Sequence, residues 1–377
     1  MCIENRRTVV IYTGGNTESI DPHERVRIAD LSTIIASTTD REFGGEFDGS
    51  LQQMPLGGEI YFVPCKTIIG KTHAERLGIH TKDDLFGGVV DKPFKSTKAI
   101  AHGLVTQRAI HPEGWNPEFT EATKDVVLPG STAFSVEDAY YALEDLLRNG
   151  HEVRVKRTLA AGGSGQAVVQ SKELLSDQLR YLADDELRKF GIVLESNLQP
   201  DGLIIRSVGQ AEIDGTLISY HGKQRETHEK DGTVHYGGSD LFIVRGDWSN
   251  LLSYVTDPLI IQAINQTKVF DEAAASHLNI IASRRNYDIA QGRDKQGQLR
   301  SGVLEQSWRI GGASGPEVLA IEAFRKDLSL KIIMGSSYNQ FGTNTSAPEG
   351  ARVHFQGRDT NYKEPLLTYT TLTKIKS

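Results

Sequence analysis

The sequence predicts an α/β fold in which a small parallel unit precedes a larger antiparallel sheet. Two β-branched runs at residues 8–12 and 59–64 flank a polar segment with helical spacing, and this strand–helix–strand order is typical of a parallel sheet. Residues 203–245 and 285–307 alternate apolar and polar side chains, with turn signals such as Asp214-Gly215 between them, which indicates antiparallel strands. Together these patterns predict an α/β (α+β) protein with more than one structural unit.

The clearest predicted helix lies within residues 135–150, SVEDAYYALEDLLRNG. Ser135 is a favourable N-cap residue, Asp138 follows three positions later as in a capping box, and Gly150 is suited to end the helix. Further helices are expected at 171–191, 258–282 and 316–326, and a short strand is expected at 192–195. A third strand in the N-terminal unit is expected before Pro93, and two strands at 285–307 should be joined at 295–298.

Composition narrows the class of protein. The chain has 377 residues and a net charge of −7, from 42 basic and 49 acidic side chains, and a general nucleic-acid binder would usually carry a basic excess. No apolar run approaches the roughly 18 residues that a membrane span needs, and the N-terminus lacks a signal-peptide core. Two cysteines are too few for a disulfide framework. We therefore expect a cytoplasmic protein without nucleic-acid or membrane partners.

A lysine inside a strand is the first candidate for chemistry. Lys156 lies in the alternating run VRVKR, where a cation is costly unless an anion meets it. The strand continues into AAGGSGQ, and the backbone N–H groups of such a loop can close over phosphates while the lysine neutralises them. The alternative is a hairpin with a glycine turn and a solvent-facing lysine.

Acidic residues in the predicted hairpin at 285–307 are the second candidate. Asp288 and Glu305 lie on neighbouring strands and Asp294 lies near the turn, so two acids facing one way could hold one or two Mg²⁺ ions. Arg285 and Arg309 stand close in sequence, and arginine suits phosphoryl oxygens. The alternative is a pair of acids engaged in surface salt bridges.

The order of these features resembles the ATP-grasp superfamily, whose members include D-alanine–D-alanine ligase, biotin carboxylase and glutathione synthetase. An early lysine segment, a helix, a strand lysine with a glycine loop, a strand that contains a glutamate and a late acid pair follow one another over roughly residues 96–315. The whole chain also resembles an uncharacterised bacterial family described as ATP-grasp-like or biotin-carboxylase-like. The resemblance implies an ATP-grasp fold with an N-terminal Rossmann-like pre-ATP-grasp domain, and ATP and Mg²⁺ as cofactors.

The resemblance also implies which residues would bind the nucleotide. An early lysine and the strand lysine would reach the phosphates, the glycine loop would cover the triphosphate, and the hinge IVLESNL at 192–198 would meet adenine. An acid just after the hinge is the candidate to hold the ribose. The implied set is Lys98, Lys156, Gly162, Gly163, Ser164, Gly165, Glu195, Leu198 and Asp201.

The stretch GVLEQSWR resembles the late strand whose glutamate bridges the metal ions in this superfamily. The implied metal-ligand candidates are Asp288, Asp294, Glu305 and Ser307. Asp288 and Asp294 are alternatives for one position, and Ser307 stands where the superfamily usually has asparagine, two places after the glutamate. Arg309 and Arg285 are the implied catalytic residues, which would neutralise the transferring phosphoryl group or hold the carboxylate of the acceptor.

These implications define an expected domain plan and activity. Residues 1–95 would form the N-terminal domain, 96–190 a linker and a lid subdomain, and 191–377 the subdomain that carries the acids. The expected enzyme is an ATP- and Mg²⁺-dependent ligase that activates a small-molecule carboxylate as an acylphosphate for attack by an amine or another nucleophile. The alternative is a non-catalytic ATP-binding regulatory or partner-binding protein. Many relatives are dimers, so a homodimer is compatible with the resemblance.

Overall fold

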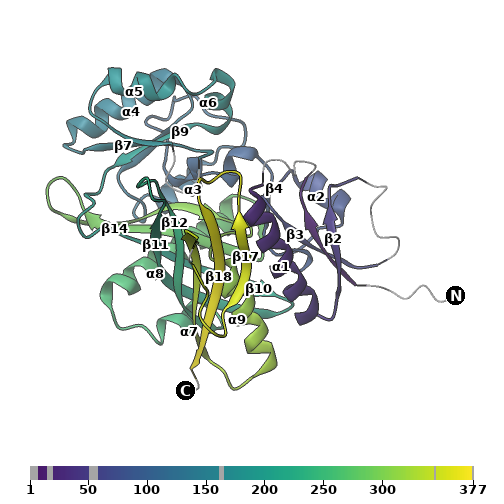
Figure 1. The fold of residues 1–377 in the computed structure, drawn as a ribbon. Coiled ribbons are helices and arrows are strands. Elements are labelled where there is room, and N and C mark those ends of the chain that lie inside the picture. Colours follow the sequence, from purple (N-terminus) through teal and green to yellow (C-terminus); the bar gives the residue numbers. More distant parts are fainter. Residues whose placement is uncertain (1–6, 15–19, 51–57, 161–164, 344, 376–377) are drawn as a thin grey trace.

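The computed structural model describes residues 7–14, 20–50, 58–160, 165–343 and 345–375. At the N-terminus, the strands β1 (Thr8–Tyr12), β2 (Glu42–Phe47) and β3 (Ile60–Pro64) form a parallel sheet in the order β2-β1-β3. The helix α1 (Pro22–Thr38) connects β1 to β2 and packs on this sheet (Figure 1). The predicted strand–helix–strand order is confirmed, but the sequence reading missed β2 because its glycine-rich, mostly exposed run EFGGEF lacks a strand pattern.

A second small sheet follows in the chain. It joins β4 (Ile68–Ile69), β5 (Gly88–Val90) and a later strand, β13 (Ile281–Ala282), in the order β13-β5-β4. The strand predicted before Pro93 is therefore only three residues long, and Pro93 begins a 3-10 turn, η3 (Pro93–Ser96). The helix α2 (Lys71–Leu77), the 3-10 turns η2 (Lys82–Asp84) and η4 (Lys98–Ala101), and the helix α3 (Pro117–Thr123) complete this irregular region.

A four-stranded antiparallel sheet in the order β6-β9-β7-β8 carries the lysine strand. Its strands are β6 (Gly130–Ala133), β7 (Val153–Arg157), β8 (Gln166–Val169) and β9 (Ile192–Ser196). The helix α4 (Val136–Arg148) packs on β6 and β9; its predicted cap is confirmed because Ser135 accepts a hydrogen bond from the N–H of Asp138. The single helix predicted at 171–191 is instead two, α5 (Lys172–Leu179) and α6 (Asp184–Phe190).

The largest element is an eight-stranded sheet in the order β15-β14-β10-β11-β12-β16-β18-β17. Asp214 and Gly215 both have positive φ at the turn between β10 and β11, as the hairpin signal predicted. The eight strands are antiparallel to their neighbours and comprise β10 (Ile204–Ile213), β11 (Thr216–His228), β12 (Val234–Arg245), β14 (Arg284–Arg293), β15 (Leu299–Ser307), β16 (Ile332–Phe341), β17 (Arg352–Arg358) and β18 (Pro365–Ile375).

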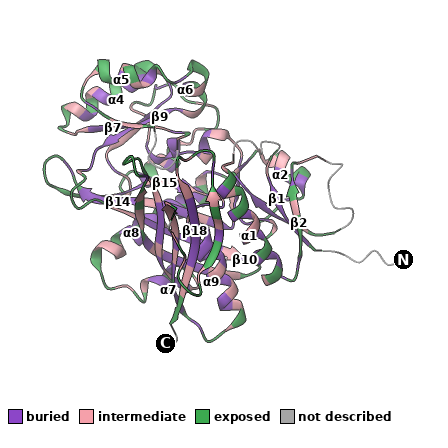
Figure 2. Ribbon diagram, viewed as in Figure 1, coloured by how far each residue is buried: buried purple, intermediate pink, exposed green. Residues whose placement is uncertain are grey.

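Helices cover both faces of this sheet. The helix α8 (Pro258–His277) contacts β10, β14 and β15, and α7 (Trp248–Leu252) contacts β11, β12 and α8. The helix α9 (Ser314–Lys326) covers the other face and also contacts α1, so one apolar core joins the first and last parts of the chain. Figure 2 shows the central strands as mostly buried and the outward helix surfaces as exposed. Among the described residues, no helix is long and apolar enough to cross a membrane.

Candidate functional site

Two carboxylates meet on the face of the large sheet that α9 covers. Asp288 on β14 lies directly opposite Glu305 on β15. The register shifts immediately beyond this pair, because Ile289 pairs with Val303 and leaves Leu304 as an extra residue. This β-bulge explains how Val303 packs in the core while Glu305, two residues later, faces the opposite side with Asp288. We call the side of the β14–β15 pair that carries these acids the acid face.

The acid face concentrates negative charge at a partly buried position. Burial and the neighbouring charge of Glu305 raise the pKa of Asp288 to about 6, although hydrogen bonds from Gln224 and Asn286 oppose the shift. Asn286 Nδ2 donates to Asp288 Oδ1 at 3.2 Å. Two like charges held side by side cost free energy unless a cation joins them, so this geometry favours binding of a cation.

Lys98 supplies one cation from a distant segment. Its ammonium lies 3.2 Å from Glu305 Oε2 and also donates to the carbonyl oxygen of Ala160 at 2.9 Å. Ala160 lies just before the glycine loop, so Lys98 connects the acid face with the segment that leads into that loop. The Lys98 side chain is buried, whereas that of Glu305 is 36% exposed, which leaves one side of the acid accessible.

A second buried charged group lies in the four-stranded sheet. Lys156 Nζ is 2.5 Å from Glu195 Oε1, and His102 Nε2 is 3.0 Å from Glu195 Oε2. Burial opposes ionisation of Glu195, but Lys156 and His102 outweigh it and lower the pKa of the carboxyl to about 2. We call these three residues the Glu195 cluster. The sequence reading missed His102, because nothing in its local segment indicates that it would meet a glutamate 93 positions away.

Three of the four implied glycine-loop residues, Gly162, Gly163 and Ser164, lie outside the described residues. Gly165 is described and has φ +62°, and a Cβ atom there would lie 2.8 Å from the Cβ of Ala160. A side chain at this position would therefore both strain the backbone and crowd the loop.

The remaining hinge and acid candidates take different positions. Leu198 is buried against Leu128 and Ala290, at the junction of the hinge and the acid strand. Asp201 lies in an exposed turn. Asp294 is at the β14–β15 turn, where its carboxylate accepts from the N–H groups of Gln296 and Gln298 and from Arg300. Of the two alternatives at the metal position, Asp288 is the one that faces Glu305, and Asp294 stabilises the turn.

The prediction that Arg285 lies beside the acids needs correction. Residues on a strand alternate between faces, and Arg285 points to the α8 side, 3.5 Å from Asp271, while its Nη2 donates to Gln210 at 2.6 Å. Arg284 shares the face of Asn286 and Asp288 instead. Its guanidinium binds both carboxylate oxygens of Glu317 in the first turn of α9, at 2.8 and 2.9 Å. The sequence reading did not assign Glu317, which looks like an ordinary helix residue.

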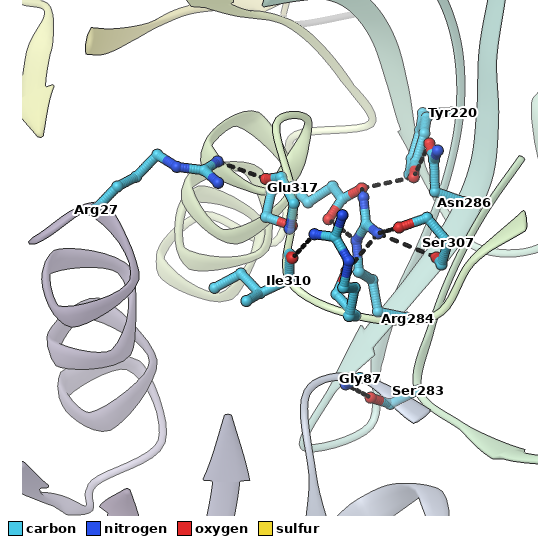
Figure 3. Close-up of polar contacts among 12 residues, drawn as sticks. Arg27, Gly87, Tyr220, Ser283, Arg284, Asn286, Ser307, Ile310 and Glu317 are labelled. Carbon is cyan, nitrogen blue, oxygen red and sulfur yellow. Dashed lines mark hydrogen bonds and ion pairs between the residues drawn. The ribbon is translucent and has the colours of Figure 1, made fainter. Parts of the chain in front are cut away.

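Ser307 contacts this arginine rather than the acids. Arg284 Nη1 donates to the hydroxyl of Ser307 at 3.1 Å and to the carbonyl oxygen of Arg309 at 2.5 Å (Figure 3). Arg309 itself is largely buried, and its Nη1 donates to the carbonyl oxygen of Ile310 at 2.9 Å. Arg27, which is labelled in Figure 3, reaches from α1 and donates to the carbonyl oxygen of Gly311 in the same turn. Three arginines therefore hold the glycine turn that precedes α9.

The donor set fits a Mg²⁺ ion that is shared with a nucleotide. No cluster of three or more His, Cys, Asp or Glu side chains that could hold a metal occurs in the part of the chain that the structure describes. Mg²⁺ at nucleotide sites is usually bound through one or two carboxylates, with phosphate oxygens and water completing its shell. Asp288 and Glu305 supply two carboxylates on opposite strands, and burial and the charge of Glu305 raise the pKa of Asp288, so a bound cation would favour its ionised form.

Comparison with solved structures identifies the class of fold. The chain is similar to an ADP complex of N5-carboxyaminoimidazole ribonucleotide synthetase (TM-score 0.54, 12% identity, 98% of this chain and 93% of that chain). It is also similar to phosphoribosylamine–glycine ligase from Thermotoga maritima (0.53, 12%, 98% and 93%) and to biotin carboxylase from Campylobacter jejuni (0.50, 11%, 97% and 87%). The fold is that of the ATP-grasp enzymes, as predicted.

The sequence comparison identifies the family within that class. Residues 11–370 match the model of a family described as "Protein of unknown function (DUF3182)". The chain therefore belongs to the DUF3182 family. No curated protein matches the sequence significantly.

Proposed function

We propose that this protein is an ATP- and Mg²⁺-dependent ligase that activates a small-molecule carboxylate as an acylphosphate for attack by an amine or another nucleophile. The observation that carries the proposal is the meeting of Lys98 with Glu305, directly opposite Asp288. These residues come from three segments, and they combine the two charges that phosphoryl transfer needs: carboxylates for Mg²⁺ and a cation for phosphate oxygens. The ATP-grasp fold supports a nucleotide as the ligand.

Each part of the site has a chemical task in this proposal. Asp288 and Glu305 would hold Mg²⁺, which when bound neutralises the β- and γ-phosphates and the charge that develops between them. Lys98 and Lys156 would bind phosphate oxygens, and the contact of Lys156 with Glu195 holds the lysine side chain in position. Arg309 would neutralise the transferring phosphoryl group or orient the acceptor carboxylate. Catalysis then consists mainly of positioning and charge neutralisation.

A small hollow lies beside the glycine turn, between α1, the start of α9 and β16–β18. Its volume is about 10 Å³, which is room for about one water molecule and too little for an acceptor. Arg27 and Thr368 line it, and each contributes a buried polar atom that has no hydrogen-bond partner among the described residues, Arg27 Nε and Thr368 Oγ1. A water molecule in the hollow would offer these atoms a partner.

Calorimetric titration with the non-hydrolysable analogue AMP-PNP, with and without Mg²⁺, tests the nucleotide site. We expect binding that depends on Mg²⁺ and is weakened at least tenfold in Lys98→Ala, a variant whose orphaned partner Glu305 can be hydrated. Lys82→Ala, which removes an ion pair with Glu212 at the surface, is the matched control and should bind normally. Absence of binding to the native protein would refute the proposal.

Turnover distinguishes the ligase from a non-catalytic nucleotide-binding protein, the alternative that the contact between Ser307 and Arg284 favours. ADP release should be measured with a panel of carboxylates and with hydroxylamine, which traps acylphosphates as hydroxamates. The ligase proposal expects carboxylate-dependent ADP and hydroxamate, lowered by a factor of about 10² or more in Glu305→Gln. Nucleotide binding without ADP release for any carboxylate would support the alternative. Full activity in Glu305→Gln would instead refute the role proposed for Glu305.

A further inference from the structure

Asn286 occupies a position on the acid face that the sequence does not indicate. It is directly opposite Ser307 across the β14–β15 pair, just as Asp288 is opposite Glu305. Asn286 and Asp288 are two residues apart on one strand, so their side chains share one face. Four polar side chains therefore form a rectangle: two carboxylates in one row, and an amide and a hydroxyl in the next.

The two members of the second row are not equally available to a cation. The hydroxyl of Ser307 accepts a hydrogen bond from the guanidinium of Arg284 at 3.1 Å, which places a positive charge beside it. Asn286 Nδ2 instead donates to Asp288 Oδ1 at 3.2 Å, so its amide already touches one of the acids. An amide oxygen is also a good ligand for Mg²⁺, which prefers oxygen donors.

The oxygen of Asn286 is held by a partner that cannot fully satisfy it. Tyr220 Oη lies 3.0 Å from Asn286 Oδ1 and 2.5 Å from Glu317 Oε1, and both atoms are hydrogen-bond acceptors. A tyrosine hydroxyl has one proton, and the shorter contact with the carboxylate is where that proton belongs. The hydroxyl oxygen of Tyr220 is then left as an acceptor that faces the amide.

This arrangement permits two orientations of the Asn286 amide. With its NH₂ group toward Asp288, the amide neutralises part of the charge of that acid. After rotation, the NH₂ group donates to the Tyr220 oxygen, and Oδ1 faces the space beside Asp288. A cation beside Asp288 would attract Oδ1 and favour the rotated orientation, because an amide oxygen is a ligand for Mg²⁺ and an amide NH₂ group is not.

The neighbouring glycine is what allows Tyr220 to make this contact. Gly209 on β10 lies between the two residues, paired with Tyr220 on one side and with Asn286 on the other. A Cβ atom at Gly209 would be 2.5 Å from Tyr220 Oη and 2.4 Å from the carbonyl oxygen of Arg285. The absence of a side chain at this position lets the tyrosine extend across a whole strand to reach the amide.

We propose that Asn286, and not Ser307, supplies the third oxygen ligand of the acid face for a divalent cation shared with the nucleotide. The amide thus comes from the strand of Asp288 instead of the strand of Glu305, and Tyr220 positions it across Gly209. The inference rests on the proposed function, because the cation is the one that would accompany ATP.

Binding of Mn²⁺ tests the assignment without any turnover. Mn²⁺ should be titrated into the protein saturated with AMP-PNP and followed by the loss of the free-ion electron paramagnetic resonance signal. We expect Asn286→Ala to weaken Mn²⁺ binding about tenfold or more, and Ser307→Ala, the rival ligand, to change it less than twofold. Asn286→Asp retains an oxygen at the position and should preserve the binding, which separates ligation from packing.

Two further results decide the case if Asn286→Ala fails to fold. Gly209→Ala displaces Tyr220, and Tyr220→Phe removes its hydroxyl, so each should weaken Mn²⁺ binding severalfold while Asn286 is intact. Equal effects of Ser307→Ala and Asn286→Ala, or unchanged Mn²⁺ binding in Asn286→Ala and Tyr220→Phe, would overturn the assignment and leave the proposed function standing. Failure of the native protein to bind AMP-PNP would overturn both.

Discussion

The Glu195 cluster and the acid face both hold charged groups, but their charges are balanced differently. In the Glu195 cluster, the carboxylate lies at hydrogen-bonding distance from Lys156 and His102, and its pKa is lowered to about 2. On the acid face, Asp288 lies opposite a second acid and its pKa is raised to about 6, while Lys98 pairs with Glu305, which is 36% exposed. The carboxylate of the first group is matched by its buried partners, whereas on the acid face one lysine is shared by two carboxylates.

This contrast predicts that removing a charge changes the free energy of unfolding in opposite directions in the two groups. Removing one member of a satisfied buried ion pair leaves the other unpaired and destabilises the fold. Removing one of two like charges relieves repulsion and stabilises it.

The largest expected effect is that of Glu195→Gln. Because Lys156 would remain buried without a counter-charge, we expect unfolding to become easier by about 3–5 kcal/mol, measured by denaturant titration. Glu186→Gln removes a partly exposed partner of Arg157 at 3.5 Å and should cost less than about 1 kcal/mol. If both variants lose equally little free energy of unfolding, the Glu195 cluster does not stabilise the fold, contrary to what its burial predicts.

Asp288→Asn should stabilise the protein at neutral pH. The folded pKa of about 6 is above the ordinary value of 3.8, so the folded state holds a proton that the unfolded state has lost between these pH values. Stability therefore falls as pH rises from about 4 through 6, and at ~1.4 kcal/mol per pKa unit the cost above pH 7 is about 2–3 kcal/mol.

Thermal unfolding from pH 4 to pH 8 measures this effect. Above pH 6, Asp288→Asn should unfold at a higher temperature than the native protein. Near pH 4 the two unfolding temperatures should be the same. Addition of Mg²⁺ with AMP-PNP should stabilise the native protein more than the variant. A variant that is less stable than the native protein throughout the range would contradict the assignment of repulsion to the acid face.

The smallest expected effect belongs to Asp294→Asn. Desolvation raises the pKa of Asp294, but hydrogen bonds from Arg300 and from two turn amides outweigh it and lower the pKa, so the ionised form stabilises the β14–β15 turn. We expect a loss of about 1 kcal/mol and no change in Mn²⁺ affinity for the AMP-PNP complex. An effect on Mn²⁺ binding as large as that of Asp288→Asn would reopen the choice between the two acids.

Local sequence patterns predicted much of the fold. Alternating side chains and turn residues correctly predicted the hairpins at Asp214-Gly215 and at 295–298, and the capping residue correctly predicted α4. Two predictions were wrong because the local pattern was weak: β2 was not recognised, and the long helix predicted after Ser171 is two helices. The candidate site residues were predicted from the order of charged residues along the chain. Their spatial neighbours were not predicted: His102, Arg27, Tyr220 and Glu317.

Periodicity and turn residues act over a few positions, so they were enough to predict which charged residues lie in strands and in what order. The direction in which each of those side chains points depends on how the strands pair in the fold. The bulge at Leu304 turns Glu305 toward Asp288, strand alternation sends Arg285 to α8, and Gly209 lets Tyr220 reach Asn286. These outcomes depend on the register between strands far apart in sequence, and register is fixed by packing on both faces of the sheet.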